Sequence, residues 1–376
     1  MGQVSIEQNY GLGKGNWDST CGTPTSYLTE FLSTEPWGVT TFSPLLNTII
    51  HGWCPNTFYE VIASSGAGKS MMSYSAMAYG YLNKFYEDGT WKDTMNTHSC
   101  LYIGTEMDIK SQVIPQIACC ESESNYNLVK LLSFSEAQMR HYKEAIEYLY
   151  ASNSIFLENE PDYNLAKLGN LVSGHIKKDH IQALFLDYME VTSSMSDKYT
   201  DDVKVLNSLA TYCKDNLATK DIAVIAFAQA NKRLENINLC DIDSSSIKGS
   251  HTIHQKADVL MYLIPGGNDD QKTIHRANGY FPYETTDQYI DKGIYSDINA
   301  KTLNPERIRK ILIGDKCRPD TSKRGLCVWC FIEDGTLRWH DLFVTDSEYR
   351  IRDMESTYLC DGTEPNTISR KSFLPF

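Results

Sequence analysis

Residues 58–70 read FYEVIASSGAGKS, and this stretch decides the fold. Its first six residues form a short apolar run rich in β-forming side chains, and residues 70–85 carry apolar side chains at three- and four-residue spacing. A glycine-rich turn between a strand and a helix is the pattern of a phosphate loop, in which backbone amides fold around phosphates at the helix N-terminus. The stretch therefore predicts an α/β fold that binds a nucleotide.

The side chains of this loop have separate expected roles. Lys69 is expected to reach the β- and γ-phosphates, and the Ser70 hydroxyl to coordinate Mg²⁺. One position departs from the pattern G-x-x-x-x-G-K-[ST], because Ala63 stands where the first glycine is usual. The alternative is a glycine-rich turn that binds no ligand. It would not explain why a Lys-Ser pair follows the turn, or why the turn lies between a strand and a helix, so we predict a site for ATP and Mg²⁺. The residues expected to hold the nucleotide are Ser65, Gly66, Ala67, Gly68, Lys69 and Ser70.

Short apolar runs alternate with longer helical patterns after this loop. The apolar runs are residues 101–104, 183–186, 222–228 and 259–264, and the helical patterns are residues 135–150, 165–178 and 203–217. This repeated βαβ order predicts a mostly parallel sheet with flanking helices. Two later strand-like runs, residues 308–313 and 326–332, predict a C-terminal β-hairpin.

Composition divides the chain into three parts. Residues 1–37 are rich in Gly, Ser, Thr and Asn and are interpreted as an N-terminal arm or linker. Residues 38–342 are expected to form the nucleotide-binding domain, with an insertion at about 265–305 that is full of Gly, Asn, Asp and Tyr. Residues 343–376 are polar without a repeated pattern, and we interpret them as a C-terminal tail.

Composition also excludes several classes of protein. With 41% hydrophobic residues and no apolar run near the ~18 to 20 residues that cross a bilayer, the sequence is that of neither a membrane protein nor a disordered chain. The net charge of -13 argues against a chain that coats nucleic acid over its whole surface, so any DNA contact must be local. The N-terminus lacks the features of a secretory signal, so the 11 cysteines are expected to be reduced in a cytoplasm. Cys327 and Cys330 form a CxxC pair without a second pair, which weighs against a zinc site.

Three polar residues follow predicted strands where a nucleotide site needs them. Asp187 ends an apolar run and is expected to hold the metal through Ser70 or a water, although it could merely cap a turn. Glu106 lies just past the run 101–104 and is the expected base that orients the attacking water; the alternative is an ordinary surface glutamate. Gln229 ends the run 222–228, where it can sense the γ-phosphate or be a simple strand-end amide.

With these residues identified, the chain resembles the ATPase domain of DnaB-type replicative DNA helicases, within the RecA-like group. The family also has alanine in place of the first glycine of the loop, as Ala63 does here. The resemblance covers about residues 38–342 in collinear order. The segments that carry it are GVTTFSPLL (residues 38–46), HGW (51–53), YIGTEM (102–107), FLDY (185–188), AFAQAN (226–231), KGSHTIHQKAD (248–258) and KCR (316–318).

This resemblance implies a RecA-like P-loop ATPase that forms a homo-oligomeric ring, six subunits being the family expectation. It implies a motor that moves on single-stranded DNA during replication in the cytoplasm of a bacterial cell. The chain is pared down, which favours a phage- or plasmid-encoded form. Only about sixty residues precede the phosphate loop, so we expect the N-terminal helical domain that binds primase in the family to be absent. A loader or primase partner is not identified by the sequence.

A basic pair near the C-terminus carries a further implication of the resemblance. Lys316 and Arg318 are similar to the family's K-x-R, which implies a lysine and an arginine finger that reach into the ATP of the neighbouring subunit. From the residues alone, the pair follows the strand-like run 308–313 and would stand on a projecting hairpin loop. An arginine in that position could stabilise the charge that develops during hydrolysis. The alternative is a solvated basic hairpin.

The DNA-binding loops that the resemblance implies are residues 190–204 and 231–250. Lys232, Arg233 and Lys248 are the basic residues we expect to contact DNA. The same two loops hold seven carboxylates. Backbone amides can follow phosphates without net charge, whereas this acidity weighs against strong DNA affinity.

Two other functions compete with the helicase interpretation. One is a RecA-like recombinase or a KaiC-like ATPase, although residues 1–37 show no clear polymerisation motif. The other is a scaffold in which ATP orders an oligomer. A scaffold does not need the hydrolytic set of Glu106, Gln229, Lys316 and Arg318.

Overall fold

The computed structural model describes residues 37–94, 96–189, 191–196, 202–230, 239–242, 255–266, 268–278, 307–354, 356–358 and 366–368. The arm expected over residues 1–37 lies outside this set except for its last residue. Among the described residues, no helix is both long enough and apolar enough to cross a membrane.

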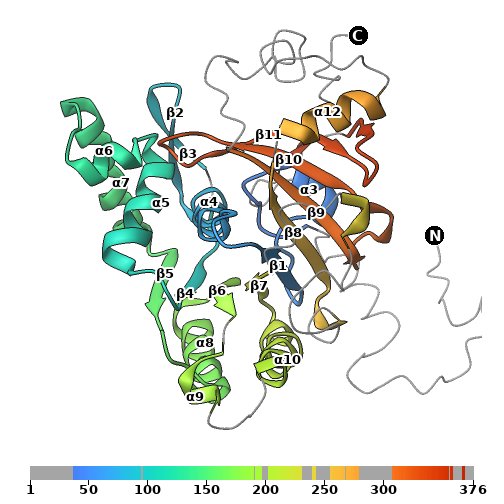
Figure 1. Cartoon of the computed structure of the whole chain (residues 1–376). Helices are drawn as coiled ribbons and strands as arrows, with labels where there is room; N and C mark the ends of the chain where they lie inside the picture. Colours follow the sequence, from blue (N-terminus) through green and yellow to red (C-terminus); the bar gives the residue numbers. More distant parts are fainter. Residues whose placement is uncertain are drawn as a thin grey trace, which may run out of the picture. The chain divides into compact units, whose positions relative to one another are not determined.

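A ten-stranded sheet runs through the described part of the chain, in the order β12-β11-β10-β9-β8-β1-β7-β6-β4-β5 (Figure 1). Six neighbouring strands are parallel: β8 (Val259–Pro265), β1 (Phe58–Ala63), β7 (Ala223–Gln229), β6 (Ala183–Met189), β4 (Cys100–Gly104) and β5 (Ile155–Asn159). The β1 strand is buried at every position, including Glu60, as its mostly apolar run predicts for a strand covered on both faces. The mostly parallel core expected from the sequence is confirmed.

The other side of the sheet is antiparallel and follows the chain order. It consists of β9 (Ile308–Cys317), β10 (Cys327–Ile332), β11 (Trp339–Thr345) and β12 (Ile351–Arg352). The pairing of β9 with β10 confirms the C-terminal hairpin. However, β11 runs across the boundary expected at residue 342, because it pairs with β10 as a further strand. The sheet therefore continues into the segment expected to be a tail, and a small pair of strands, β13 (Ser356–Tyr358) and β14 (Asn366–Ile368), follows it.

Helices cover both faces of the sheet. On one face, α3 (Pro44–Ile50), α4 (Lys69–Tyr81) and α5 (Ile114–Ser122) share an apolar core with β1 and with β9 and β10. On the other face, α8 (Leu165–Asp179) and α10 (Asp202–Tyr212) pack on β4, β6 and β7 (Figure 1), and α12 (Asn268–Ala277) packs beside β8 and β9. The helix α12 lies within the expected insertion at 265–305, whose residues 279–305 are outside the described set.

The remaining elements connect these layers. After α4, a hairpin of β2 (Lys84–Glu87) and β3 (Thr90–Asp93) leads to β4, so the helical pattern expected to residue 85 ends at Tyr81. Between β4 and β5 lie a π-helical turn η2 (Ile109–Val113), α5, α6 (Tyr126–Leu131) and α7 (Glu136–Ser152). Ser135 begins α7 with a reciprocal capping box to Gln138. A short α9 (Ser193–Ser196) precedes α10, and η3 (Cys213–Leu217) and η4 (Ala218–Lys220) lead to β7.

Candidate active site

The glycine-rich loop connects the carboxyl end of β1 to the first turn of α4. Gly66 and Gly68 have φ of 78° and 106°, in the left-handed region that side chains with a Cβ rarely adopt. Gly68 precedes the helix, and its carbonyl accepts the Met72 N–H at 2.8 Å, which closes the first helical turn. The chain therefore turns at the positions where the sequence has glycine, and the amides of the first turn of α4 lie at a helix N-terminus suited to phosphate.

Ala63 does not need to be glycine at its position. It is the last residue of β1, fully buried, and it pairs with Gln229 on one side and Leu263 on the other. Its carbonyl accepts the N–H of Ala230 at 2.8 Å. Because the backbone at Ala63 is an ordinary strand held from both sides, a residue with a Cβ fits there without strain.

Lys69 is the first residue of α4, and its side chain turns back to the loop. Its Nζ donates to the carbonyl of Ser64 at 3.3 Å and lies 5.8 Å from the centre of the Tyr188 ring. Burial lowers the pKa of the Lys69 amine, and the charges of Asp187 and Glu106 oppose this change. The ammonium is thus partly desolvated between two carboxylates, where a phosphate would gain more from it than in open water.

Asp187 is buried at the end of β6 and is tied to the loop helix. Its carboxylate accepts hydrogen bonds from Ser70 and, at 3.1 Å, from the hydroxyl of Tyr102. Burial raises the pKa of this carboxyl, an effect that both hydrogen bonds and the charge of Lys69 oppose. A carboxylate and a hydroxyl bonded to each other offer two hard oxygen donors side by side, which fits Mg²⁺.

The structure brings the other expected polar residues to the same edge of the sheet. Ala63 pairs with Gln229, and Gly104, two residues before Glu106, pairs with Asp187. Both Glu106 and Gln229 are exposed. Because the carboxyl ends of parallel strands meet at one edge, the loop, the Ser70–Asp187 pair, Glu106 and Gln229 lie at the edge where α/β sheets bind ligands.

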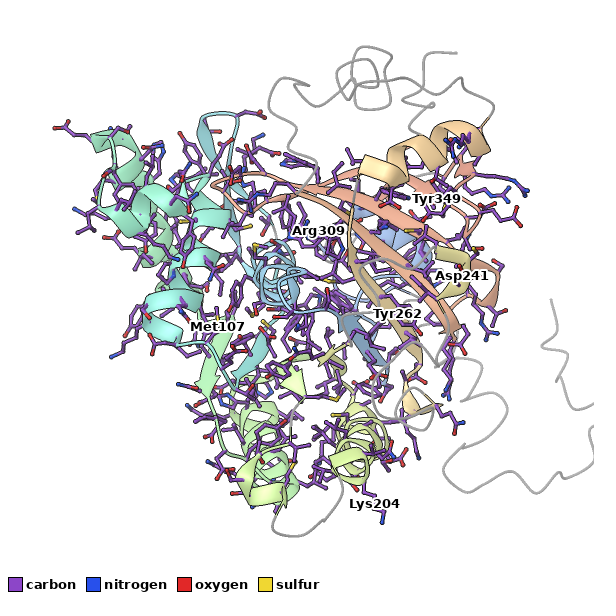
Figure 2. The ribbon with its side chains drawn as sticks, viewed as in Figure 1. Met107, Lys204, Asp241, Tyr262, Arg309 and Tyr349 are labelled. Atoms are coloured by element: carbon purple, nitrogen blue, oxygen red, sulfur yellow. The ribbon has the colours of Figure 1, made fainter. Side chains whose placement is uncertain are left out.

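Arg309, on β9, is a residue that the sequence did not single out. Its Nε donates to the carbonyl of Ala67 in the loop at 2.6 Å, and the side chain lies beside α4 (Figure 2). The residue is 6% exposed. Burial, with a smaller effect of Arg307, lowers the pKa of the guanidinium to about 10, so it stays charged at neutral pH. A buried cation therefore holds the loop from behind. The feature of the sequence that could have indicated Arg309 is a charged residue inside the apolar run 308–313.

We expect Arg309→Met to weaken ATP binding by about 10- to 100-fold, because a charge-assisted hydrogen bond to the loop is lost and the Ala67 carbonyl is left unsatisfied. Calorimetric titration with ATP measures this. The matched control is Lys310→Met, since Lys310 is equally buried but points to the opposite face, where it pairs with Asp270 at 2.7 Å. Equal losses of ATP affinity in both variants would mean that Arg309 only stabilises the sheet.

Lys316 and Arg318 lie at the other end of β9. The strand extends to Cys317, so Lys316 is part of it and the expectation of a projecting loop for the whole pair is wrong. Cys317 pairs with Val259, at the amino end of β8, whereas the phosphate loop follows β1 and lies at the edge of the sheet where β8 has its carboxyl end. At ~3.3 Å per residue, β8 separates Arg318 from its own phosphate loop by about 20 Å.

Two further predicted features have different outcomes. The basic residues Lys232, Arg233 and Lys248, expected to contact DNA, lie outside the described residues. Cys327 and Cys330 are buried in β10 and belong to separate apolar clusters on opposite faces of the sheet. Their thiols therefore cannot share one metal ion.

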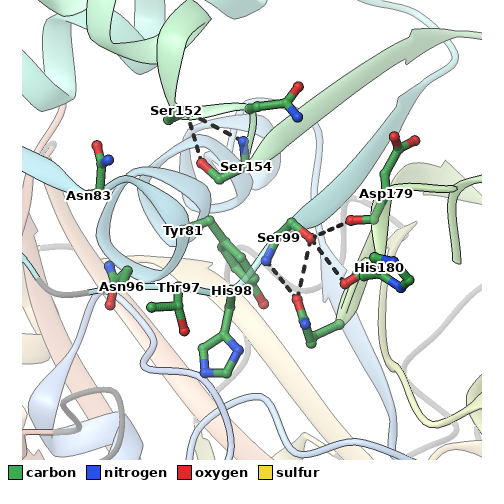
Figure 3. Close-up of a pocket in the computed structure, with 12 residues that line it drawn as sticks. Tyr81, Asn83, Asn96, Thr97, His98, Ser99, Ser152, Ser154, Asp179 and His180 are labelled. Atoms are coloured by element: carbon green, nitrogen blue, oxygen red, sulfur yellow. Dashed lines mark hydrogen bonds between the residues drawn. The ribbon is translucent and has the colours of Figure 1, made fainter.

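A separate polar cavity of about 240 Å³ lies at the amino edge of the parallel strands (Figure 3). Ser99 and Gln182, which precede β4 and β6, line it and are joined by a hydrogen bond of 2.6 Å from the Ser99 N–H. The buried hydroxyl of Tyr81, which also lines it, has no hydrogen-bond partner among the described residues. None of the residues expected to bind nucleotide lines this cavity, so it is distinct from the site at the carboxyl edge.

Comparison with known protein families gives a match over most of the chain. Residues 38–292 match the model of the family "DnaB-like helicase C terminal domain". Two curated relatives are each 22% identical: the SPbeta prophage-derived uncharacterized protein YorI of Bacillus subtilis, over 68% of this chain and 53% of that protein, and the replicative DNA helicase DnaB of Mycoplasma genitalium, over 62% and 47%. The chain thus spans about half the length of these relatives.

Solved structures share the fold. One of them, an isolated ATPase domain, superposes with a TM-score of 0.60 at 14% identity, over 88% of this chain and 100% of that one. A DnaB-like replicative helicase, described with its interactions with primase, also gives 0.60 at 14% identity, over 84% of this chain and 66% of that one. The RecA-like architecture expected from the sequence is confirmed.

Proposed function

We propose that this chain, which belongs to the family of DnaB-like helicase C-terminal domains, is the ATPase motor of a ring-shaped helicase that moves on single-stranded DNA during replication. The observation that carries the proposal is the arrangement at the carboxyl edge of the sheet. A phosphate loop, the Ser70–Asp187 pair, and exposed Glu106 and Gln229 all lie there. The family implies a helicase that hydrolyses a nucleoside triphosphate, and ATP with Mg²⁺ fits these residues.

Each residue of the site has a proposed task. The loop amides and Lys69 bind the phosphates, and Ser70 with Asp187 holds the metal that neutralises them. Glu106, exposed in the loop after β4, orients the attacking water and accepts its proton. Gln229, at the end of the strand beside β1, contacts the γ-phosphate and so distinguishes ATP from ADP.

The position of Arg318 supports the proposal of a ring, for which the family expectation is six protomers. Since about 20 Å of sheet separates it from the loop of its own chain, it acts on the ATP of a neighbouring protomer. Such an arrangement makes each active site depend on two chains. Arg318 would then stabilise the charge on the transferred phosphoryl group, and Lys316 would support it.

The proposed substrate is single-stranded DNA, contacted by Lys232, Arg233 and Lys248. The cell that holds it would be bacterial, with the protein in its cytoplasm and of phage origin, as the prophage-derived relative suggests. A primase is a proposed partner, because one structural relative is described with its interactions with primase.

The ATPase rate is expected to rise when single-stranded DNA is added. The measurement is steady-state hydrolysis with and without an oligothymidylate, on material whose oligomeric state has been determined by light scattering. A motor couples hydrolysis to movement along DNA, so DNA should stimulate it. An unstimulated ring that also fails to bind the oligonucleotide would instead favour the ATP-ordered scaffold, and open filaments on DNA would favour a RecA-like recombinase.

The variant that identifies the DNA path replaces Lys232, Arg233 and Lys248 with alanine. If these three side chains contact phosphates, single-strand affinity falls and the slope of log affinity against log salt decreases by about 2, at ~0.7 per lost contact. The control is Lys143→Ala, an exposed lysine on α7, outside both expected DNA-binding loops. An unchanged affinity and slope in the triple variant would place the DNA elsewhere.

A further inference from the structure

Asp258 joins the start of β1, the start of β8 and the end of β9. One carboxylate oxygen, Oδ1, contacts the NH1 nitrogen of Arg318 at 2.6 Å. The other, Oδ2, accepts the backbone N–H of Phe58 at 2.8 Å and contacts Nζ of Lys214 at 2.6 Å. The backbone of Asp258 adds two bonds, from its N–H to the Phe58 carbonyl at 2.8 Å and to its carbonyl from the Arg318 N–H at 3.0 Å.

Burial differs strongly between the members of this cluster. The side chain of Asp258 is 5% exposed, whereas that of Arg318 is 59% exposed. A buried carboxylate therefore holds the NH1 nitrogen of Arg318, while most of this side chain faces solvent. A guanidinium has five N–H donors in a planar fork, so one nitrogen can be held from behind while others face a phosphate.

We propose that Asp258 is the positioning residue of the arginine finger: it fixes both the backbone and the guanidinium of Arg318 so that this side chain meets the neighbouring protomer's nucleotide in the correct orientation. The inference rests on the proposed function, in which Arg318 acts on a neighbouring chain. Asp258 itself touches no nucleotide in this arrangement. Its carboxylate acts through Arg318, and Lys214 balances the second oxygen.

Holding a side chain in advance of the reaction has a kinetic consequence. An arginine free to rotate would occupy the productive orientation only part of the time, and a misplacement of about 1 Å can cost about 10²-fold in rate. ATP binding depends on the phosphate loop of the other chain and would not change. Loss of Asp258 should therefore lower kcat and leave KM for ATP unaltered.

Asp258→Asn is the first variant, because asparagine keeps the size of the side chain and removes its charge. We expect kcat to fall by about 10²-fold with unchanged KM and unchanged ring assembly. Addition of the same change to an Arg318→Ala chain should cause no further loss, since the residue that Asp258 positions is already gone. A further loss of rate in the double variant would overturn the proposal.

Two control variants come from the same region. Lys214→Met removes one of the two partners of Oδ2 without touching Arg318 and should leave most of kcat. Asp215→Asn removes a neighbouring carboxylate that pairs with Lys256 at 3.2 Å on the surface, and should have no effect. Equal losses of kcat in Asp215→Asn and Asp258→Asn would mean that Asp258 contributes only negative charge to this region and does not position Arg318.

Mixed rings decide where the defect lies. An Asp258→Asn chain has an intact phosphate loop, so mixing it with a Lys69→Ala chain, which has an intact Arg318 and Asp258, should restore activity at the interfaces that pair the two. Mixing Asp258→Asn with Arg318→Ala should restore little, because neither chain supplies a well-held finger. The opposite pattern would show that Asp258 acts on its own phosphate loop through β1, and would overturn the proposal.

The proposed function is tested separately in the same experiment. If mixing Lys69→Ala with Arg318→Ala restores no activity, the finger in trans is wrong, whatever Asp258 does. If that pair recovers activity but the two Asp258→Asn mixtures do not differ as described, only the positioning role is wrong. Should Asp258→Asn fail to fold by circular dichroism, Asp258→Glu is the replacement, since it keeps the buried charge but displaces the carboxylate by one methylene.

Discussion

A chain in which Arg318 is replaced by alanine is expected to bind ATP with unchanged affinity and to hydrolyse it about 10³-fold more slowly or worse. The loss appears in the rate because the guanidinium stabilises charge that develops only during transfer. Affinity is unchanged because the ATP that Arg318 acts on is bound by the phosphate loop of the neighbouring chain, and Arg318 lies too far from its own loop, near the amino end of β8, to affect that one. Calorimetry gives the affinity, and steady-state phosphate release gives the rate.

Mixing tests the same arrangement without any assumption about the isolated chains. Lys69→Ala removes the loop lysine and is expected to abolish nucleotide binding, but that chain still carries Arg318. The Arg318→Ala chain still binds ATP. After subunit exchange, interfaces that pair an intact loop with an intact finger should hydrolyse ATP. Failure to recover any activity would leave the split active site unsupported.

The second large effect is expected at Glu106. Glu106→Gln should bind ATP and assemble normally but hydrolyse ATP about 10²- to 10⁴-fold more slowly, because glutamine cannot accept the proton of the attacking water. A single-turnover assay measures the chemical step directly. Loss of this carboxylate also removes one of the two negative charges beside Lys69, so the site repels phosphate less and ATP affinity should not decrease.

The matched control is Asp108→Asn, two residues further along the same loop. Asp108 is exposed and caps the turn η2 by accepting the Ser111 N–H at 2.7 Å, and asparagine caps equally well. This variant should keep the native rate. If Glu106→Gln also kept it, the base would have to be another group at the carboxyl edge of the sheet.

The sequence predicts those parts of the fold whose pattern of apolar and polar residues is local and belongs to one kind of element. The strands β1, β4, β6, β7 and β8 are buried on both faces, so each is a mostly apolar run that is visible without knowledge of its neighbours. The phosphate loop is equally local, because its glycines, lysine and serine are consecutive. The βαβ order and the edge at which the polar residues meet then follow from general rules of parallel sheets.

Elements at the margins of the sheet were missed for a different reason. The strand β5 (Ile155–Asn159) is an edge strand whose residues are only partly buried, so it has neither a long apolar run nor clear alternation. In β11, His340 and Asp341 interrupt the apolar pattern. The carboxylate of Asp341 accepts the N–H of Leu45 at 2.7 Å near the start of α3, a partner 296 residues away that no local pattern reveals.

The candidate site shows the same division. Asp187, Glu106 and Gln229 could be predicted because each follows an apolar run. Arg309 could not, since its partner is the carbonyl of Ala67, 242 residues earlier in the chain. The role of Asp258 likewise could not be predicted, because it depends on contacts with Phe58 and Arg318, which folding brings together at the opposite edge. Sequence spacing identifies the chemical groups, whereas tertiary contacts decide what holds them in place.

The place of β1 between β7 and β8 has a consequence for synthesis of the protein. Its first hydrogen bond to Asp258 joins residues 200 positions apart. At ~5–20 residues per second of translation, roughly 10–40 s pass between the emergence of β1 from the ribosome and that of its partner β8. During this interval a strand that is apolar except for Glu60 has an unpaired edge, and such a segment tends to aggregate or to recruit chaperones. The phosphate loop is thus made long before β1, the strand that carries it, can pair with both of its neighbours.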